Sequence, residues 1–66
     1  MNKKEQIEQM EAAKAIVQTA IDARQETYDD HTEDWQESDK GQAYLAVTEK
    51  LEEVLDELDN AKDELA

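Results

Sequence analysis

The carboxylates in the polar middle of this chain are the residues that most invite a chemical role. Clustered acidic oxygens are typical of calcium loops, which need oxygen ligands at loop positions 1, 3 and 5, Gly at position 6 and Glu at position 12. Counted from Asp30, position 6 is Trp35 and position 12 is Gly41. Counted from Asp29, position 12 is Lys40. Neither frame fits a calcium loop, so weak and non-specific divalent binding is the lesser alternative here.

The remaining side chains do not form a catalytic or metal-binding group. The chain has no Cys and a single His, His31, whereas a zinc site needs several nitrogen or sulfur ligands. The Glu-x-x-His pairs of a di-iron bundle and the Gly-rich loop of a phosphate site are also missing. We therefore expect no enzyme activity, no catalytic residue, no cofactor and no metal, and we interpret His31 as a bystander in an exposed connection.

The charge of the chain is its strongest functional signal. Nineteen Asp and Glu residues stand against seven Lys and Arg, which gives a net charge of −12. Small domains usually carry a net charge of about 2–8 in magnitude. Such a field repels nucleic acid and membranes and attracts basic protein surfaces. No apolar run approaches the roughly 18–20 residues of a membrane span, and the opening Met-Asn-Lys-Lys-Glu leads into no apolar run, so we expect no signal peptide and a cytoplasmic protein.

The elements that must position these charges are two long helices. Apolar and long side chains recur at alternating spacings of three and four, as in the contact line of a helix pair. The first run is Ile7, Met10, Lys14, Val17, Ile21, Arg24 and Tyr28; the second is Tyr44, Val47, Leu51, Val54, Leu58, Ala61 and Leu65. We expect helices over about 3–28 and 37–65, folded as one all-α domain over 1–66, an antiparallel two-helix hairpin.

An antiparallel register follows from pairing the two runs. Ile21 would meet Val47, and the other pairs would be Val17–Leu51, Met10–Leu58 and Ile7–Ala61. Arg24 would lie on Tyr44 as a cation–π pair. Lys14 would reach past Val54 to Glu53 or Glu57.

The connection carries cap residues and the one Trp. Ser38 is the expected N-cap of the second helix, and Thr32 or Asp30 would cap a short turn that holds Trp35. We interpret Trp35 as a plug at the open end of the hairpin, packed on Tyr28 and on Tyr44 or Leu45. The alternative is an anchor for a partner, since Trp and Tyr are enriched at interface hot spots.

Some apolar residues fall outside the two runs. The sequence predicts that Ile16, Ala20, Leu45 and Leu55 form a second stripe, for another copy or for a partner helix. Two hairpins joined there would make a homodimeric four-helix bundle. A monomer that tolerates these residues at its surface is the alternative.

The acids of the second helix are the candidate partner-binding residues: Glu49, Glu52, Glu53, Asp56, Asp59 and Asp63. A surface that only needed to be soluble would mix Lys with these acids, because like charges three or four apart destabilise a helix. We expect this face to bind a basic protein surface, in its sharpest form as a nucleic-acid mimic that inhibits a nucleic-acid-binding protein. The alternatives are a structural or assembly module and a hairpin without a specific ligand.

The segment Trp35-Gln-Glu-Ser-Asp-Lys-Gly41, with the Leu-Glu-Glu-Val-Leu-Asp-Glu-Leu run that starts at Leu51, carries a resemblance. This second half of the chain resembles small uncharacterised acidic proteins of bacteria and their phages. The resemblance implies a bacterial host cell or phage setting, in which small acidic proteins often inhibit host defence or nucleic-acid enzymes. It implies no particular functional residue.

Overall fold

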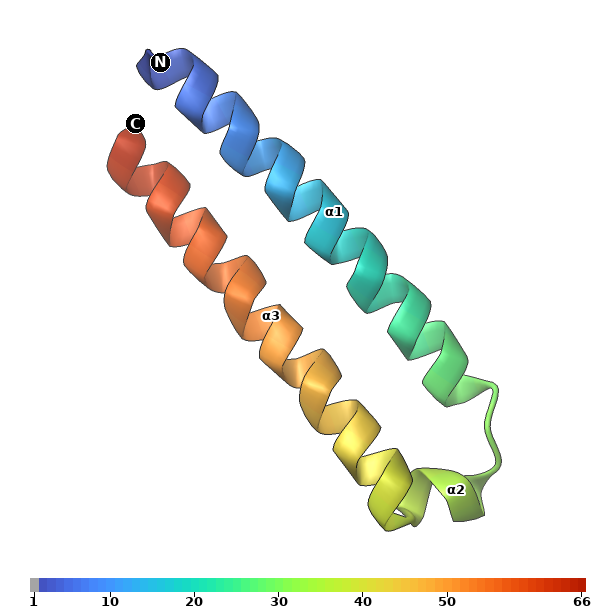
Figure 1. Cartoon of the computed structure of the whole chain (residues 1–66). Helices are drawn as coiled ribbons and strands as arrows, with labels where there is room; N and C mark the ends of the chain where they lie inside the picture. Colours follow the sequence, from blue (N-terminus) through green and yellow to red (C-terminus); the bar gives the residue numbers. More distant parts are fainter. Residues whose placement is uncertain (1) are drawn as a thin grey trace.

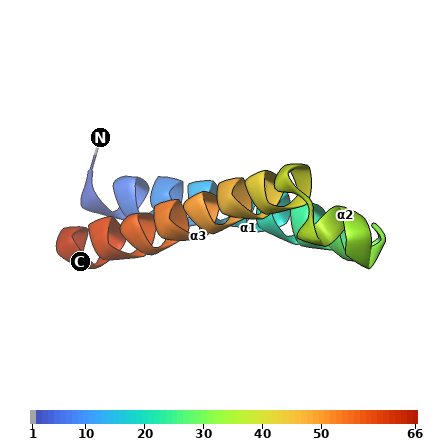
Figure 2. The ribbon, with the colours of Figure 1, turned by 90° about the horizontal axis from the view of Figure 1, so that it is seen from below.

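The computed structural model describes residues 2–66 and consists of three helices: α1 (Lys3–Asp29), α2 (Glu33–Glu37) and α3 (Asp39–Leu65). The long helices α1 and α3 lie side by side and run in opposite directions, so the start of α1 and the end of α3 lie at one end of the molecule and α2 lies at the other (Figure 1). Seen from below, α1 and α3 cross at a shallow angle (Figure 2). The molecule measures 50 × 16 × 13 Å. The predicted all-α hairpin is confirmed.

Each helix begins at a side-chain cap that satisfies a backbone N–H of the first turn. Asn2 accepts from the Glu5 N–H at 2.8 Å, Thr32 accepts from Trp35 at 3.3 Å, and Ser38 accepts from Gly41 at 3.2 Å. The caps predicted at Thr32 and Ser38 are confirmed. The backbone of Ser38 is extended (φ −70°, ψ 165°), so α2 ends before Ser38 and α3 begins after it. The first residue of α3 is therefore Asp39, two residues later than the sequence predicted.

The contact line between the long helices, which we call the seam, is as predicted on α1. Its α1 members are all buried or half-buried: Ile7, Met10, Lys14, Val17, Ile21, Arg24 and Tyr28. Ile21, at the centre, is the one buried hydrophobic side chain among residues 2–66, with 2% of its surface exposed. A pair of helices has only one layer of contact, which explains why so few side chains are fully enclosed.

On α3 the seam differs from the prediction. Val47 and Val54 were expected to face α1, but they are 51% and 39% exposed, whereas Thr48 is only 2% exposed. The α3 members of the seam are Gly41, Tyr44, Thr48, Leu51, Leu55, Leu58, Lys62 and Leu65. The predicted pairing of Ile21 with Val47 is therefore wrong, because α3 is rotated so that the residue after each of these valines faces α1.

Arg24 explains much of this rotation. Its Nε donates to Thr48 Oγ1 at 3.0 Å, and its guanidinium also donates to the Tyr44 carbonyl at 3.1 Å. The guanidinium carbon lies 3.9 Å from the centre of the Tyr44 ring, so the predicted cation–π pair is confirmed. Thr48 in turn donates to the Tyr44 carbonyl at 3.3 Å. These bonds hold Thr48 against α1, where it is buried.

Aromatic rings close the end of the hairpin that carries α2. Trp35 makes edge contacts with Tyr28 and Tyr44, at ring-centre distances of 5.9 and 5.8 Å. The predicted packing of Trp35 on these two tyrosines is confirmed. His31 lies exposed in the connection, as predicted, and its ring stacks on Trp35 with the ring centres 3.7 Å apart. A ring nitrogen of His31 also lies 2.7 Å from the Thr27 carbonyl oxygen.

None of the helices formed by residues 3–65 is long and apolar enough to cross a membrane. The chain instead places polar side chains along most of both long helices. The functional question is therefore how these polar side chains are distributed around the hairpin.

Candidate interaction surfaces

The two long sides of the hairpin are defined by their position relative to the seam. One step along an α-helix rotates the side chain by about 100°. Because α1 and α3 are both right-handed and run in opposite directions, the residues that directly follow seam residues lie on one side of the hairpin in both helices. Residues that directly precede seam residues lie on the other side.

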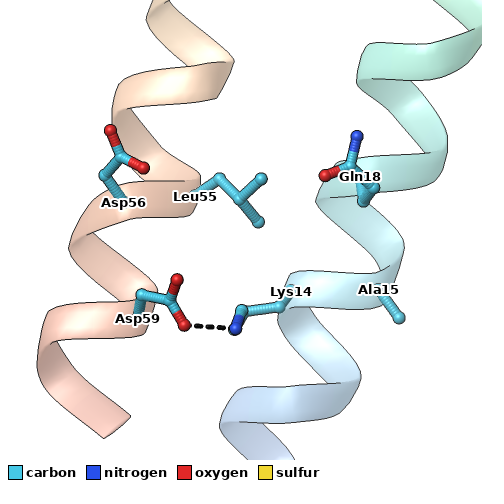
Figure 3. A pocket seen from close by; sticks show the side chains of 6 residues that line it. All are labelled: Lys14, Ala15, Gln18, Leu55, Asp56 and Asp59. Atoms are coloured by element: carbon cyan, nitrogen blue, oxygen red, sulfur yellow. Dashed lines mark hydrogen bonds and ion pairs between the residues drawn. The ribbon is translucent and has the colours of Figure 1, made fainter. Parts of the chain in front are cut away.

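Polar contacts between the helices confirm this arrangement. Gln25 Nε2 donates to Glu52 Oε1 at 3.2 Å, and both residues directly follow seam residues. Lys14 forms an ion pair with Asp59, which follows Leu58 (Figure 3). Lys62 Nζ lies 3.4 Å from Glu11 Oε1 on the same side. The prediction that Lys14 reaches Glu53 or Glu57 is wrong, since the rotation of α3 brings Asp59 to it instead.

Every charged residue that directly follows a seam residue is acidic, and we call this side the acidic face. Its members are Glu8, Glu11, Asp22 and Asp29 of α1 and Glu49, Glu52, Asp56, Asp59 and Asp63 of α3. All of them are exposed. The ammonium groups of Lys14 and Lys62, which belong to the seam, reach this face and pair with Asp59 and Glu11.

The six acids predicted to bind a partner are not all on this face. Five of them are, whereas Glu53 points away from α1 and pairs with Lys50 at 3.2 Å. The sequence reasoning also missed the four acids of α1. Each of these four acids directly follows a seam residue of α1, and this position could have identified them from the sequence. The link to the acids of α3 was missed because the α3 seam was predicted one residue too early, at Val47 and Val54.

Two open hollows lie on the acidic side of the seam. The first, of about 360 Å³, lies between the Lys14–Asp59 pair and Gln18, Leu55 and Asp56 (Figure 3). The second, of about 300 Å³, is lined by Gln25, Tyr28, Asp29, Leu45 and Thr48. Both are shallow depressions rather than enclosed sites. The acidic face is therefore uneven, but neither hollow forms a closed pocket for a small molecule.

The Lys14–Asp59 pair is electrostatically distinct within the acidic face. The hydrogen bond from Lys14, helped by its positive charge and that of Lys62, lowers the pKa of Asp59. The same hydrogen bond, with the nearby charges of Asp59, Glu11 and Asp63, raises the pKa of Lys14. Partial desolvation opposes both shifts. The pair is therefore favoured in its charged form.

These shifts predict a pH-dependent difference between two variants. A lowered pKa of Asp59 stabilises the fold above the ordinary Asp value of 3.8, and this contribution is lost as the pH falls below it. Asp59→Asn should therefore have a lower Tm at pH 7 than Asp56→Asn, which removes the same charge from a residue without such a pair. The gap should close in acid, where the carboxyl group of Asp59 is protonated and no longer pairs with Lys14. Thermal unfolding by circular dichroism measures it, and a gap that persists in acid would contradict the assignment.

The side that precedes the seam is apolar in its middle, and we call it the apolar face. It consists of Ala13, Ile16, Ala20, Val47, Val54 and Ala61. Ile16 is 71% exposed, and with Val47 and Val54 it completes the set of large hydrophobic side chains exposed among residues 2–66. The charges that precede seam residues balance: Lys40 and Lys50 stand against Glu57 and Glu64.

The four residues predicted as a second apolar stripe do not share one surface. Ile16 and Ala20 lie on the apolar face. Leu45 and Leu55 are half-buried and line the two hollows on the acidic side. Val47 and Val54, rather than Leu45 and Leu55, therefore lie with Ile16 and Ala20 on the apolar face.

The acids do not converge on one point. Within residues 2–66, no three His, Cys, Asp or Glu side chains lie close enough together to hold a metal ion. The acidic face is instead a row of separate charges along two helices. Such a row suits an extended binding surface better than a point-like site.

Comparison with known proteins finds no match to a family model, to a curated protein or to a solved structure. The resemblance of the Trp35–Gly41 segment to small acidic proteins of bacteria and phages therefore stays an expectation from the sequence. Functional proposals for this chain rest on the residues of its own two faces.

Proposed function

We propose that this protein is a non-enzymatic interaction protein whose acidic face binds a basic surface of a protein partner. The observation that carries the proposal is the segregation of charge: every charged residue that directly follows a seam residue is acidic, whereas the preceding positions carry balanced charge. A helix surface that only needs to be solvated has no reason to place one sign of charge on one side. Concentrated like charge also costs helix stability, so a compensating use is expected.

The dimensions of the acidic face fit an extended basic groove. From Glu49 to Asp63 the α3 row spans about 21 Å at about 1.5 Å per residue. The acids of α1 form a second row, about 8–10 Å away across the helix pair. Charges in the α3 row recur every three or four residues, or about 4.5–6 Å, against about 3.4 Å for the phosphates of one nucleic-acid strand.

This geometry favours a nucleic-acid mimic as the specific form of the proposal. A groove that binds phosphates through Lys and Arg would accept two rows of carboxylates in place of the phosphates. The partner would then be a nucleic-acid-binding protein, which the hairpin inhibits by occupying its groove. A phage or mobile-element protein acting in the cytoplasm of a bacterial host would be a natural setting for such an inhibitor.

A charge-matched pair of variants tests the proposal. The first neutralises the acidic face with Asp22→Asn, Asp56→Asn and Asp63→Asn. The control neutralises three acids elsewhere with Glu53→Gln, Glu57→Gln and Glu64→Gln. Because both variants lose the same charge, a difference between them reports on the acidic face rather than on net charge.

The measurement is affinity capture from a bacterial lysate, with the wild-type chain and both variants as baits. Wild type and control should retain a partner that the acidic-face variant loses, and salt or added duplex DNA should release it. Equal retention by all three baits would contradict the proposal. Release by salt but not by DNA would leave a basic partner and remove the mimic.

A structural or assembly module is the alternative function, favoured by the exposed Ile16, Val47 and Val54. In that case Ile16→Asp should abolish function, whereas neutralising Glu52 and Asp56 should not. Leu55→Asp, at another residue of the predicted second stripe, would not serve the same purpose. Leu55 is a seam residue, so that substitution would disturb the hairpin itself and cannot distinguish the two functions.

A further inference from the structure

The apolar face leaves the hairpin with more exposed surface than a protein of its size normally has. The chain exposes 4932 Å², whereas a folded protein of 7.6 kDa is expected to expose about 4,300 Å². The excess of roughly 600 Å² approaches the ~800 Å² that each partner buries in a standard interface. Covering one long face would bring the exposed area into the normal range.

The heptad pattern of α3 indicates what covers this face. Hydrophobic residues fill two heptad positions of α3: the series of Tyr44, Leu51, Leu58 and Leu65, and the series of Val47, Val54 and Ala61. The other series of the seam, Gly41, Thr48, Leu55 and Lys62, contains one large hydrophobic residue. A contact with a single neighbouring helix uses two such positions, and here the Val47 series is left outside. A hydrophobic series that lies outside the contact line is typical of a helix that packs against more than one neighbour in a bundle.

Charge identifies the neighbour. A second copy of a chain with a net charge of −12 is repelled by the acidic face. The positions that precede the seam have balanced charges, with Lys40 and Lys50 against Glu57 and Glu64, so two copies can meet there without a net repulsive field. The alanines at 13, 20 and 61 allow close approach of helices, and Ile16, Val47 and Val54 supply the volume to fill the contact.

We propose that the apolar face, made by Ala13, Ile16, Ala20, Val47, Val54 and Ala61, binds the same face of a second copy of this chain. The two hairpins form a four-helix bundle with an isologous interface. The acidic faces then lie on opposite outer sides of the dimer, so that one dimer presents two acidic faces. Salt strengthens this association, because it screens the residual repulsion between the two chains.

The oligomeric state of the full chain tests the proposal. Light scattering after gel filtration, from low to high micromolar protein, should give twice 7.6 kDa for the wild type at the upper end. Ile16→Gln with Val54→Gln should halve this mass, whereas Asp56→Asn with Asp63→Asn on the acidic face should leave it unchanged. A wild-type chain that stays at 7.6 kDa throughout, or a dimer that survives Ile16→Gln with Val54→Gln, would overturn the proposal.

Thiol reactivity provides a second measurement that does not depend on the folding of the double variant. The chain has no Cys, so single cysteines report their own position. Alkylation of Val54→Cys should slow several-fold as the protein concentration rises, and alkylation of Glu53→Cys should not. Equal rates for Val54→Cys at both concentrations would overturn the proposal. The sign of the salt effect separates this interface from the acidic face, where salt weakens binding.

Discussion

Gly41→Ala is expected to destabilise the hairpin by about 1–3 kcal/mol, the usual cost of forcing extra volume into a packed site. Helix propensity alone predicts the opposite, since Ala is favoured over Gly by about 1 kcal/mol inside a helix. Gly41 is buried in the first turn of α3, where the backbone of α2 passes directly over it. A Cβ there would meet the Trp35 carbonyl oxygen and would lie 2.7 Å from the Gln36 oxygen and 2.8 Å from its Cα.

The Gly41 prediction is severe because the obstruction is backbone rather than a flexible side chain. To make room, α2 would have to move away from α3, and Trp35 would lose its contacts with Tyr28 and Tyr44. Chemical unfolding followed by circular dichroism measures the stability, and Trp35 fluorescence reports the movement of α2. The total stability of 66 residues is about 3–10 kcal/mol, so the loss is a large share.

Ala43→Gly is the matched control for Gly41→Ala. Ala43 is exposed on α3, so its replacement should cost about 1 kcal/mol through helix propensity alone, with unchanged Trp35 fluorescence. Both exchanges between Gly and Ala should thus destabilise, each for a different reason. A Gly41→Ala protein as stable as wild type, with the same Trp35 emission, would show that α2 does not rest on α3 in this way.

Ile21→Ala should destabilise the hairpin by about 2–3 kcal/mol, near the lower end of the range for a buried Ile. Ile21 is the buried hydrophobic residue at the centre of the seam, with 2% of its surface exposed. The lower end applies because two helices enclose the cavity less completely than a larger core, so the site can partly collapse. Urea unfolding at low micromolar concentration measures the loss.

Ile16→Ala is the control for Ile21→Ala, since it makes the same change five residues earlier on α1. Ile16 is 71% exposed in the single hairpin, so its truncation should cost about 0.5 kcal/mol or less at low protein concentration. If two copies associate through the apolar face, the cost should rise with concentration. An Ile16→Ala loss as large as that of Ile21→Ala at every concentration would contradict the assignment of the seam.

The amino-acid sequence by itself determined the local structure of this protein. Alternating spacings of three and four predict both long helices, and Thr32 and Ser38 were recognisable as caps because a hydroxyl that accepts a first-turn N–H acts within three residues. The Arg24–Tyr44 pair and the packing of Trp35 on two tyrosines were also predictable. These features lie close to the connection, where the short chain segment leaves little freedom of register.

Only the tertiary structure decided which side of α3 faces α1. Hydrophobicity favours the series of Val47 and Val54 over the series with Thr48 and Leu55, so by itself it predicts the wrong side of α3. The side of α3 that faces α1 is instead fixed by polar and steric contacts between residues distant in sequence. Arg24 donates a hydrogen bond to Thr48, Lys14 pairs with Asp59, and Gly41 must lie under α2.

The rotation of α3 by one residue position also decides which surfaces are candidates for function. It moves Val47 and Val54 to the surface beside Ile16, and it gathers the acids of both helices on the opposite side. The separation into an acidic face and an apolar face is therefore a property of the packed pair. A single helix does not show this separation. The two faces are defined only when α1 and α3 pack together, because the packing fixes which residues form the seam and therefore which residues precede and follow it.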